Sequence, residues 1–283
     1  MIIETIQDQI IYSTLRIVAT DGCETSIGTG FFVVDNQKFK EHPVLVTNKH
    51  VVGRYNRADF TFCGKSAEGK PIDSYHITIS VLDLQERIIM HPDDEVDLCG
   101  ILLEDVINNA INTGKEPFYI CVGTDFFITG DILKGLTAIE NVIMVGYPEG
   151  LIDIFNNKPV VRKGITATSY KLDYAGRKVF MIDMAVFHGS SGSPVFLETR
   201  GLSKQRKVRD KNSFSVPLSL STDYCFVGVV YGVPRKSVKG ELKIVEAPTN
   251  KKLVSETELM TNLGFVIKAE KVKELINTIN DGR

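Results

Sequence analysis

The chain contains 283 residues, of which 43% are hydrophobic and 24% are charged, and its formal net charge is −2. This composition is typical of a globular protein in aqueous solution, and the near-neutral charge gives no electrostatic reason to expect nucleic acid or an anionic membrane as a partner. No apolar run approaches the roughly eighteen residues that a membrane-spanning helix needs. We therefore expect no nucleic acid and no membrane among its partners.

The first 22 residues have no basic leader and no continuous apolar stretch, so we expect no signal peptide. An exported form from which a leader has been removed is the weaker alternative. The cysteines are odd in number and widely scattered, at Cys23, Cys63, Cys99, Cys121 and Cys225. Such thiols are typical of a reducing compartment, and without a CxxC pair they indicate no zinc site. The predicted location is cytoplasmic, and neither a metal nor another cofactor is expected.

Short apolar runs rich in β-branched residues, separated by Gly, Asn, Asp and Pro, dominate most of the chain. Many short strands at this spacing predict an all-β sandwich or barrel. In chain order, the predicted strands lie at residues 28–34, 42–48, 75–82, 98–103, 142–148, 178–186, 193–197, 225–232 and 263–267.

Three segments depart from the strand pattern. Residues 198–222 and 234–261 are polar and are interpreted as insertions, and the first contains "RGLSKQRKVRDK" with six basic residues and one acidic residue. We interpret that run as a solvated loop, with a docking surface for an acidic partner as the alternative. The stretch "KAEKVKELINTIND" predicts an amphipathic helix from about 268 to 280, packed on the barrel.

A glycine-framed serine lies in "FHGSSGSPVF", residues 187–196. Taken alone, this stretch predicts only a turn, because Gly and Ser are the commonest turn residues. Alternatively, Gly189 and Gly192 bend the chain so that the N–H groups of Gly189 and Ser191 point into one space beside the Ser191 hydroxyl. That arrangement would be an oxyanion hole next to a nucleophile. Because a serine hydroxyl is a weak nucleophile, this hypothesis requires a histidine base elsewhere.

His50 is the predicted base. It follows the apolar run in "VLVTNKHVV", where a strand gives way to a turn and a side chain can be both fixed and exposed. The other histidines considered, His42, His76 and His91, are interpreted as surface or packing residues.

A carboxylate must orient such a histidine, and "HPDDEVDLCGILL" supplies one. Asp97 stands between Val96 and the apolar run that follows it, so its desolvation is costly unless it is paired. Asp93 and Glu95 are interpreted as solvated loop charges, and Asp94 is the reserve candidate.

The chain order His50, Asp97, Ser191 is that of the chymotrypsin triad, and the α/β-hydrolases and subtilisin have other orders. With it, the sequence resembles the trypsin-like (chymotrypsin-fold) serine peptidases over most of its length, and within them the protease domain of the Deg/HtrA family and the glutamyl endopeptidases. The segments that carry the resemblance are "GTGFFVV", "VLVTNKHVV", "VDLCGILL", "VIMVGYPEG", "KGITATSY", "IDMAVFHGSSGSPVF" and "LGFVIKAEKVKELI".

The resemblance implies a serine endopeptidase with two six-stranded antiparallel β-barrels and a C-terminal α-helix. Residues 1–115 would form the barrel that carries His50 and Asp97, and residues 116–283 the barrel that carries Ser191, together one peptidase domain. Ser191 would be the nucleophile, His50 the general base and acid, and the N–H groups of Gly189 and Ser191 the oxyanion hole. A protein or peptide is the expected substrate. Unlike in the Deg peptidases, we expect no PDZ-like extension.

Two departures from the resemblance concern control and specificity. Ser190 occupies the position where digestive zymogens carry an Asp that pairs with a newly cut N-terminus, so activation by a protein partner or signal is an open alternative. At the predicted base of the specificity pocket stands Ala185, and Val230 replaces the His of the glutamyl endopeptidases.

The pocket residues predicted from the resemblance are uncharged apart from a rim histidine: Ala185, Val230, Tyr231, Gly232 and His188. Because burying an unpaired charge there is costly, we expect small or medium apolar residues before the scissile bond. The competing hypotheses are a trypsin-like fold kept as a non-catalytic binding module, and an esterase or transferase that uses the same triad.

Overall fold

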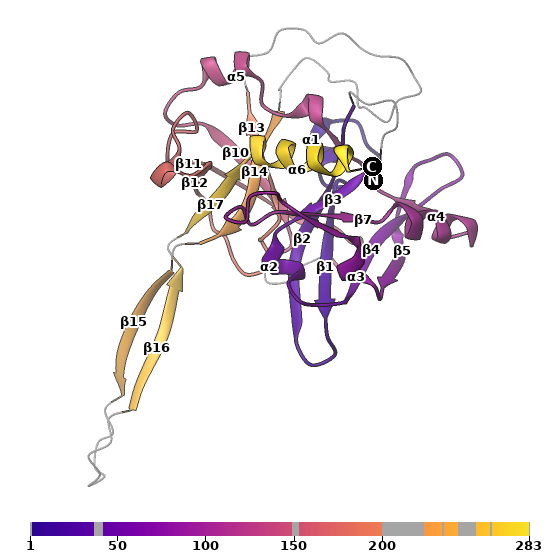
Figure 1. Cartoon of the computed structure of the whole chain (residues 1–283), viewed down its shortest axis with the longest axis horizontal. Coiled ribbons are helices and arrows are strands. Elements are labelled where there is room, and N and C mark those ends of the chain that lie inside the picture. The colour runs from indigo at the N-terminus through magenta and orange to yellow at the C-terminus, as the bar shows by residue number, and fades with distance from the viewer. Residues whose placement is uncertain are drawn as a thin grey trace.

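The strands form a large open sheet, a closed barrel and a separate two-stranded hairpin (Figure 1). The computed structural model describes residues 2–36, 42–148, 153–199, 224–233, 235–242, 253–260 and 262–282.

The open sheet takes in the N-terminal part of the chain, and its strands follow the order β5-β4-β1-β2-β3-β7-β6, with β8 paired to β4 and β9 to β2. The central strand β2 is buried along its last seven residues, as its aromatic and β-branched composition favours. The strands of this sheet are β1 (Thr14–Thr20), β2 (Thr25–Val34), β3 (Val44–Thr47), β4 (Arg57–Lys65), β5 (Pro71–Val81), β6 (Ile88–Met90), β7 (Cys99–Leu102), β8 (Pro117–Phe118) and β9 (Val122–Gly123).

The barrel takes in the C-terminal part of the chain and closes in the order β10-β11-β12-β17-β14-β13. Register shifts occur between Val195 and Phe196, just after the predicted serine turn, and between Val230 and Gly232, where the Val230 carbonyl accepts from the Gly192 N–H of that turn. Irregularities of this kind bend a strand and re-aim its neighbours. The barrel strands are β10 (Asn141–Gly146), β11 (Val160–Thr166), β12 (Val179–Asp183), β13 (Pro194–Glu198), β14 (Tyr224–Gly232) and β17 (Leu263–Lys268).

In the described parts of the chain, helices are few and mostly short, and the longest of them is the C-terminal one. They are α1 (Ile6–Ile10), α2 (Lys49–Val52), α3 (Leu84–Arg87), α4 (Glu104–Asn112), α5 (Gly130–Gly135) and α6 (Ala269–Asp281), with 3-10 turns η1 (Thr124–Phe126) and η3 (Tyr174–Gly176). The helices in the described parts of the chain are too short or too polar to span a bilayer.

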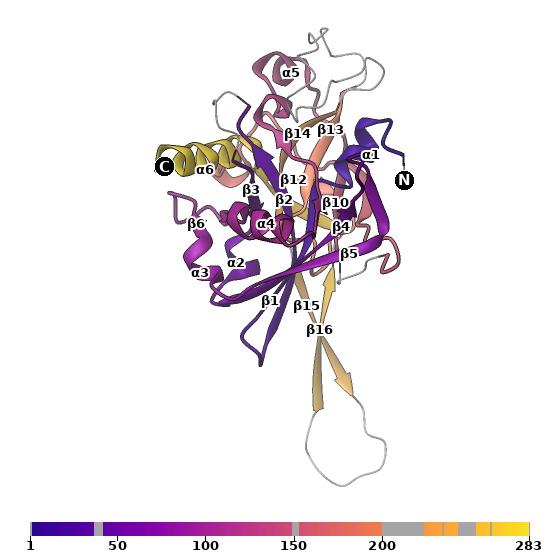
Figure 2. The same ribbon diagram turned by 90° about the vertical axis from the view of Figure 1, so that its right-hand side faces the viewer.

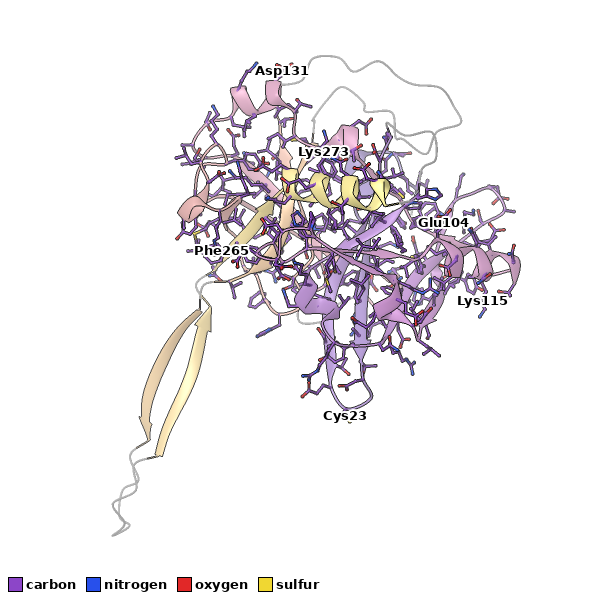
Figure 3. All side chains as sticks on the ribbon, in the orientation of Figure 1. Cys23, Glu104, Lys115, Asp131, Phe265 and Lys273 are labelled. Carbon is purple, nitrogen blue, oxygen red and sulfur yellow. The ribbon has the colours of Figure 1, made fainter. Side chains whose placement is uncertain are left out.

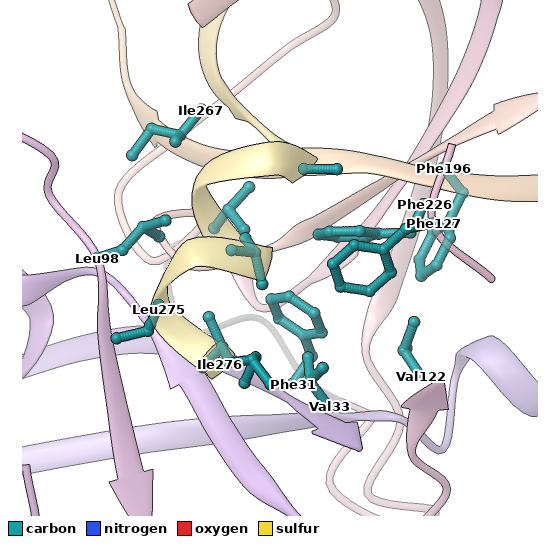
Figure 4. Packing of buried hydrophobic residues seen from close by; sticks show 14 of the residues in the cluster. Phe31, Val33, Leu98, Val122, Phe127, Phe196, Phe226, Ile267, Leu275 and Ile276 are labelled. Atoms are coloured by element: carbon teal, nitrogen blue, oxygen red, sulfur yellow. The ribbon is translucent and has the colours of Figure 1, made fainter. Parts of the chain in front are cut away.

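One hydrophobic cluster joins the two sheets and α6. It contains Phe31 of β2, Phe196 and Phe226 of the barrel, and Leu275 and Ile276 of α6, all fully or almost fully buried (Figure 4). Leu98, which follows Asp97 in the chain, packs in the same cluster. The position of Asp97 is therefore tied to the core that both sheets share.

Strands β15 (Arg235–Leu242) and β16 (Leu253–Met260) pair antiparallel as a hairpin that projects from the rest of the molecule (Figure 2). The polar segment predicted at 234–261 thus contains paired strands. Of the other predicted insertion, at 198–222, only Glu198 and Thr199 are described, and the basic run lies outside the described residues.

The predicted all-β class, the barrel and the C-terminal helix are confirmed, and the helix spans Ala269–Asp281. The described N-terminal strands form an open nine-stranded sheet with β5 and β6 at its edges. β8 and β9, which follow the expected boundary at 115, still pair with this sheet. Cys23 is exposed in the turn after β1, whereas Cys63, Cys99 and Cys225 are buried (Figure 3).

Candidate active site

The structure brings His50 and Asp97 together although 47 positions separate them. His50 lies on the short helix α2, directly after β3, and Asp97 lies two residues before the start of β7, which pairs with β3. His50 Nδ1 lies 2.5 Å from Asp97 Oδ2, and the His50 backbone N–H donates to Asp97 Oδ1 at 3.1 Å. Both carboxylate oxygens therefore contact the same residue, which orients the imidazole.

Neighbouring residues fix the backbone of this pair. The Asn48 side-chain amide, which is fully buried, donates to the Asp97 carbonyl at 2.7 Å. Lys49 Nζ donates to the carbonyls of Asp93 and Asp94, each at 3.4 Å. The Asp94 side chain is exposed, so Asp97 and not the reserve candidate Asp94 is the carboxylate that contacts His50.

The serine turn is closed by its own hydrogen bonds. The Ser190 N–H donates to the Phe187 carbonyl at 3.0 Å, and the Ser190 hydroxyl accepts from the Phe187 N–H at 3.3 Å. Ser190 thus holds the turn locally, at the position where digestive zymogens carry an Asp. Gly189 and Gly192 have φ of 84° and 86°, in the left-handed region that favours glycine.

Some backbone donors of the turn are bonded and others are not. The Gly192 N–H donates to the Val230 carbonyl at 2.8 Å, and the Ser193 N–H donates to the Ser190 carbonyl at 3.0 Å. By contrast, the N–H groups of Gly189 and Ser191 make no hydrogen bond with any other described residue. They are the two donors that the sequence predicted for an oxyanion hole.

The serine turn rests on the open sheet at Thr29 of β2, a residue that the sequence reasoning missed. The Ser191 carbonyl accepts from the Thr29 N–H at 2.9 Å, and the Thr29 hydroxyl donates to the Gly189 carbonyl at 3.0 Å. A Cβ on Gly192 would overlap the Thr29 carbonyl and crowd the hydroxyl of Thr47, the last residue of β3. Ser191 is therefore next to the strand that leads into His50, although no hydrogen bond joins the two side chains among the described residues.

The residues predicted for the specificity pocket differ in burial. Val230 is fully buried in the barrel core, and its backbone bonds both Gly192 and Ser193. Ala185, Tyr231 and Gly232 are partly buried. His188 is exposed, as expected for a rim residue.

A small cavity of about 210 Å³ lies beside Asp97. Its lining includes Asp97, Tyr231 and Arg177. Burial raises the pKa of the Tyr231 hydroxyl, the charge of Arg177 opposes that rise, and the Asp97 carboxylate adds to it. The hydroxyl therefore stays protonated beside Asp97.

The other histidines have local partners. His42 Nδ1 lies 2.6 Å from Glu104 Oε2, His76 Nε2 lies 2.9 Å from the Asp73 carbonyl, and His91 Nδ1 accepts from the Asp93 N–H at 3.0 Å. No group of acidic, histidine and cysteine side chains suited to a metal ion occurs in the described part of the chain.

The family model of the trypsin-like peptidase domain matches residues 28–202, more than half of the chain. This chain therefore belongs to the trypsin-like peptidase domain family, and its barrel, second sheet and C-terminal helix match the chymotrypsin-like fold. The matched range contains His50, Asp97 and Ser191. No curated protein matches the chain.

Among solved structures, the chain is similar to the thermostable serine protease AL20 from an extremophilic microorganism, with a TM-score of 0.49 and 10% identity over 96% of this chain and 98% of that one. A serine endoprotease from Yersinia pestis gives a TM-score of 0.47 and 13% identity over 100% of this chain and 70% of that one. The scabies mite inactivated protease paralogue S-I1 gives a TM-score of 0.44 and 12% identity, over 96% of this chain and 96% of that one.

Proposed function

We propose that this member of the family is a serine endopeptidase that cleaves protein or peptide substrates through an acyl-enzyme. The observation that carries the proposal is the His50–Asp97 contact at 2.5 Å, with a serine turn that leaves two N–H donors unbonded among the described residues. Asp97 accepts from His50 Nδ1–H, so the neutral imidazole keeps Nε2 as its basic atom.

In the proposed reaction, His50 takes the proton of the Ser191 hydroxyl as the Ser191 oxygen attacks the substrate carbonyl. The negative charge that develops on the carbonyl oxygen is stabilised by the N–H groups of Gly189 and Ser191. His50 then gives its proton to the leaving amine, and a water activated by the same imidazole releases the acyl group. Loss of one oxyanion donor in such a site costs about 2.7 to 4 kcal/mol of transition-state stabilisation.

For specificity, we propose a preference for small or medium apolar residues before the scissile bond. The support is chemical: Ala185 is partly buried and carries no charge, and an unpaired substrate charge against it would be costly to desolvate. Cleavage of a mixed peptide library, with the cut sites read by mass spectrometry, tests this preference. A majority of cuts after Arg, Lys or Glu would overturn it.

The alternative is a binding module without catalysis, or an enzyme that is inactive until a partner orders the serine turn. The second case, an enzyme inactive at rest, is motivated by a peptide group of the serine turn. The His188–Gly189 peptide group has no hydrogen-bond partner in the described residues at either its carbonyl or its N–H. Rotation of this peptide group would withdraw the Gly189 donor from the site.

Labelling of the purified protein with a fluorophosphonate probe tests the proposal, because the probe reacts only with an activated serine. Strong labelling is expected for the wild type and for Ser193→Ala, a matched serine of the same turn whose hydroxyl has no described partner. Ser191→Ala should not be labelled, and its peptide hydrolysis should fall by about a millionfold. A well-folded wild type that is not labelled would contradict an active resting enzyme.

A further inference from the structure

Thr29 is a fully buried residue whose polar groups are all hydrogen-bonded. Its N–H donates to the Ser191 carbonyl, and its carbonyl accepts from the Thr47 hydroxyl at 2.7 Å. Its hydroxyl makes two further bonds, to Gly189 and Tyr147. A β-branched residue is common in a strand, but this one contacts the serine turn, the end of β3 and the end of β10.

The direction of the Thr29 hydroxyl follows from its two partners. The Tyr147 N–H can only donate, so the Thr29 oxygen accepts from it at 3.1 Å. The hydroxyl hydrogen is then left for the Gly189 carbonyl, which can only accept, at 3.0 Å. Of the side chains with this size and shape, only a β-hydroxyl fills both roles.

These contacts fix two peptide groups of the serine turn. In the Gly189–Ser190 group, the carbonyl accepts from the Thr29 hydroxyl and the N–H donates to Phe187. In the Ser191–Gly192 group, the carbonyl accepts from the Thr29 N–H and the N–H donates to Val230. Each group is held at both ends: its carbonyl is bonded to Thr29 of the open sheet, and its N–H is bonded to Phe187 of the turn or to Val230 of the barrel. The Ser190–Ser191 group between them has its carbonyl bonded to the Ser193 N–H, and its own N–H, that of Ser191, has no hydrogen-bond partner among the described residues.

We propose that Thr29 is a positioning residue for the oxyanion hole: its hydroxyl and its N–H fix the peptide groups on either side of the Ser190–Ser191 group and so aim the Ser191 N–H donor. The proposal rests on the proposed serine peptidase function. No hydrogen bond joins Thr29 to the Ser191 hydroxyl in the described part of the chain. Its effect passes through Gly189, and it links the serine turn to the same strand pair that carries Thr47 and leads to His50.

The test compares Thr29→Val, which keeps the shape and removes the hydroxyl, with Thr29→Ser, which keeps the hydroxyl. The matched control is Thr166→Val, since Thr166 is another buried threonine whose hydroxyl accepts a backbone N–H, from Glu140 at 3.0 Å, away from the serine turn. The rate of fluorophosphonate labelling, kcat and KM on a cleaved peptide, and the melting temperature are measured for each variant.

Thr29→Val should slow labelling and lower kcat at least tenfold with little change in KM, because an oxyanion donor acts mainly in the transition state. Thr29→Ser should recover most of the rate. Thr166→Val should lower the melting temperature by a similar amount to Thr29→Val while labelling stays near the wild-type rate. Equal rates in Thr29→Val and Thr166→Val would overturn the positioning role.

Hydrogen–deuterium exchange of the peptide that covers residues 186–193 separates this proposal from the proposed function. Thr29→Val should speed exchange at Ser190 and Gly192, and neither Thr29→Ser nor Thr166→Val should. If the wild type is not labelled but exchange responds in this way, the catalytic proposal fails and the positioning of the turn stands. If exchange in Thr29→Val is unchanged, the positioning role is wrong whatever the activity.

Discussion

His50 and Asp97 form a pair whose chemistry depends on which imidazole nitrogen carries the proton. Asp97 Oδ2 accepts from Nδ1–H, and its other oxygen accepts from the His50 backbone N–H. An amide side chain at position 97 could keep much of this geometry but could present its NH₂ group to the imidazole. The ring would then favour the tautomer with its proton on Nε2, where it cannot act as a base.

We therefore expect Asp97→Asn to lower kcat on the order of ten-thousandfold while the protein stays folded. Asp94→Asn is the control, because Asp94 lies in the same loop but its carboxylate is exposed and only its carbonyl contacts Lys49. Steady-state hydrolysis with matched melting curves measures both. A loss in Asp94→Asn as large as in Asp97→Asn would mean that the loop, and not the tautomer, limits the reaction.

The C-terminal helix α6 is amphipathic, and it reaches the loop that carries Asp97 through a charged contact as well as through the core. His91, which is almost fully buried, places Nε2 3.5 Å from Glu274 Oε2. Lys271 of the same helix pairs with Asp93 at 3.6 Å and with Glu274 at 2.9 Å. Burial lowers the pKa of His91, which the backbone contact to Asp93 and the charge of Glu274 only partly offset.

This pKa shift predicts a pH-dependent stability. The folded state binds the His91 proton less readily than the unfolded state, whose pKa is about 6.5, so the unfolded state gains more protons as the pH falls below that value. The free energy of unfolding should therefore decrease from pH 7 towards pH 5. In His91→Asn, whose amide oxygen can still accept from the Asp93 N–H, the decrease should be smaller. Urea unfolding at several pH values measures the difference, and parallel curves for the two proteins would refute it.

Across the molecule, the open sheet and the barrel share one hydrophobic core. The cluster that contains Phe31, Phe226 and Leu275 includes side chains from both sheets and from α6, the last helix of the chain (Figure 4). Separating the sheets would expose this surface to water at a cost of roughly 25 cal/mol for each Å² of apolar area. Neither sheet can therefore be expected to keep its native packing alone.

We expect the chain to unfold as one cooperative unit in spite of its length. With nine tyrosines and no tryptophan, tyrosine fluorescence reports tertiary packing and circular dichroism reports the strands. For the full chain, the two signals should give coincident urea transitions. A fragment of residues 1–127 expressed alone should show no cooperative unfolding transition. Two separate transitions, or a folded N-terminal fragment, would mean that the shared cluster contributes less than the core of each sheet.

Much of this architecture could be predicted from local patterns. Runs of β-branched residues between turn residues predicted the strands, and a 3.6-residue apolar period predicted α6 to within about one residue of Ala269–Asp281. Asp97 could be preferred over Asp94 because its neighbours are apolar and Asp94 lies among other charges. Gly189 and Gly192 could be identified as special because few other residues adopt the positive φ that they have.

Other features arise only when distant segments meet. Thr29 lies 160 positions from Gly189 and 118 from Tyr147, and within its own strand it is an ordinary β-branched residue. The full burial of Val230 and the open path of the N-terminal sheet likewise depend on which strands pair. Local patterns specify backbone conformation and which face of an element is apolar. The partner of a buried hydroxyl is decided by packing, because each buried donor and acceptor must find its complement among residues brought together by the fold.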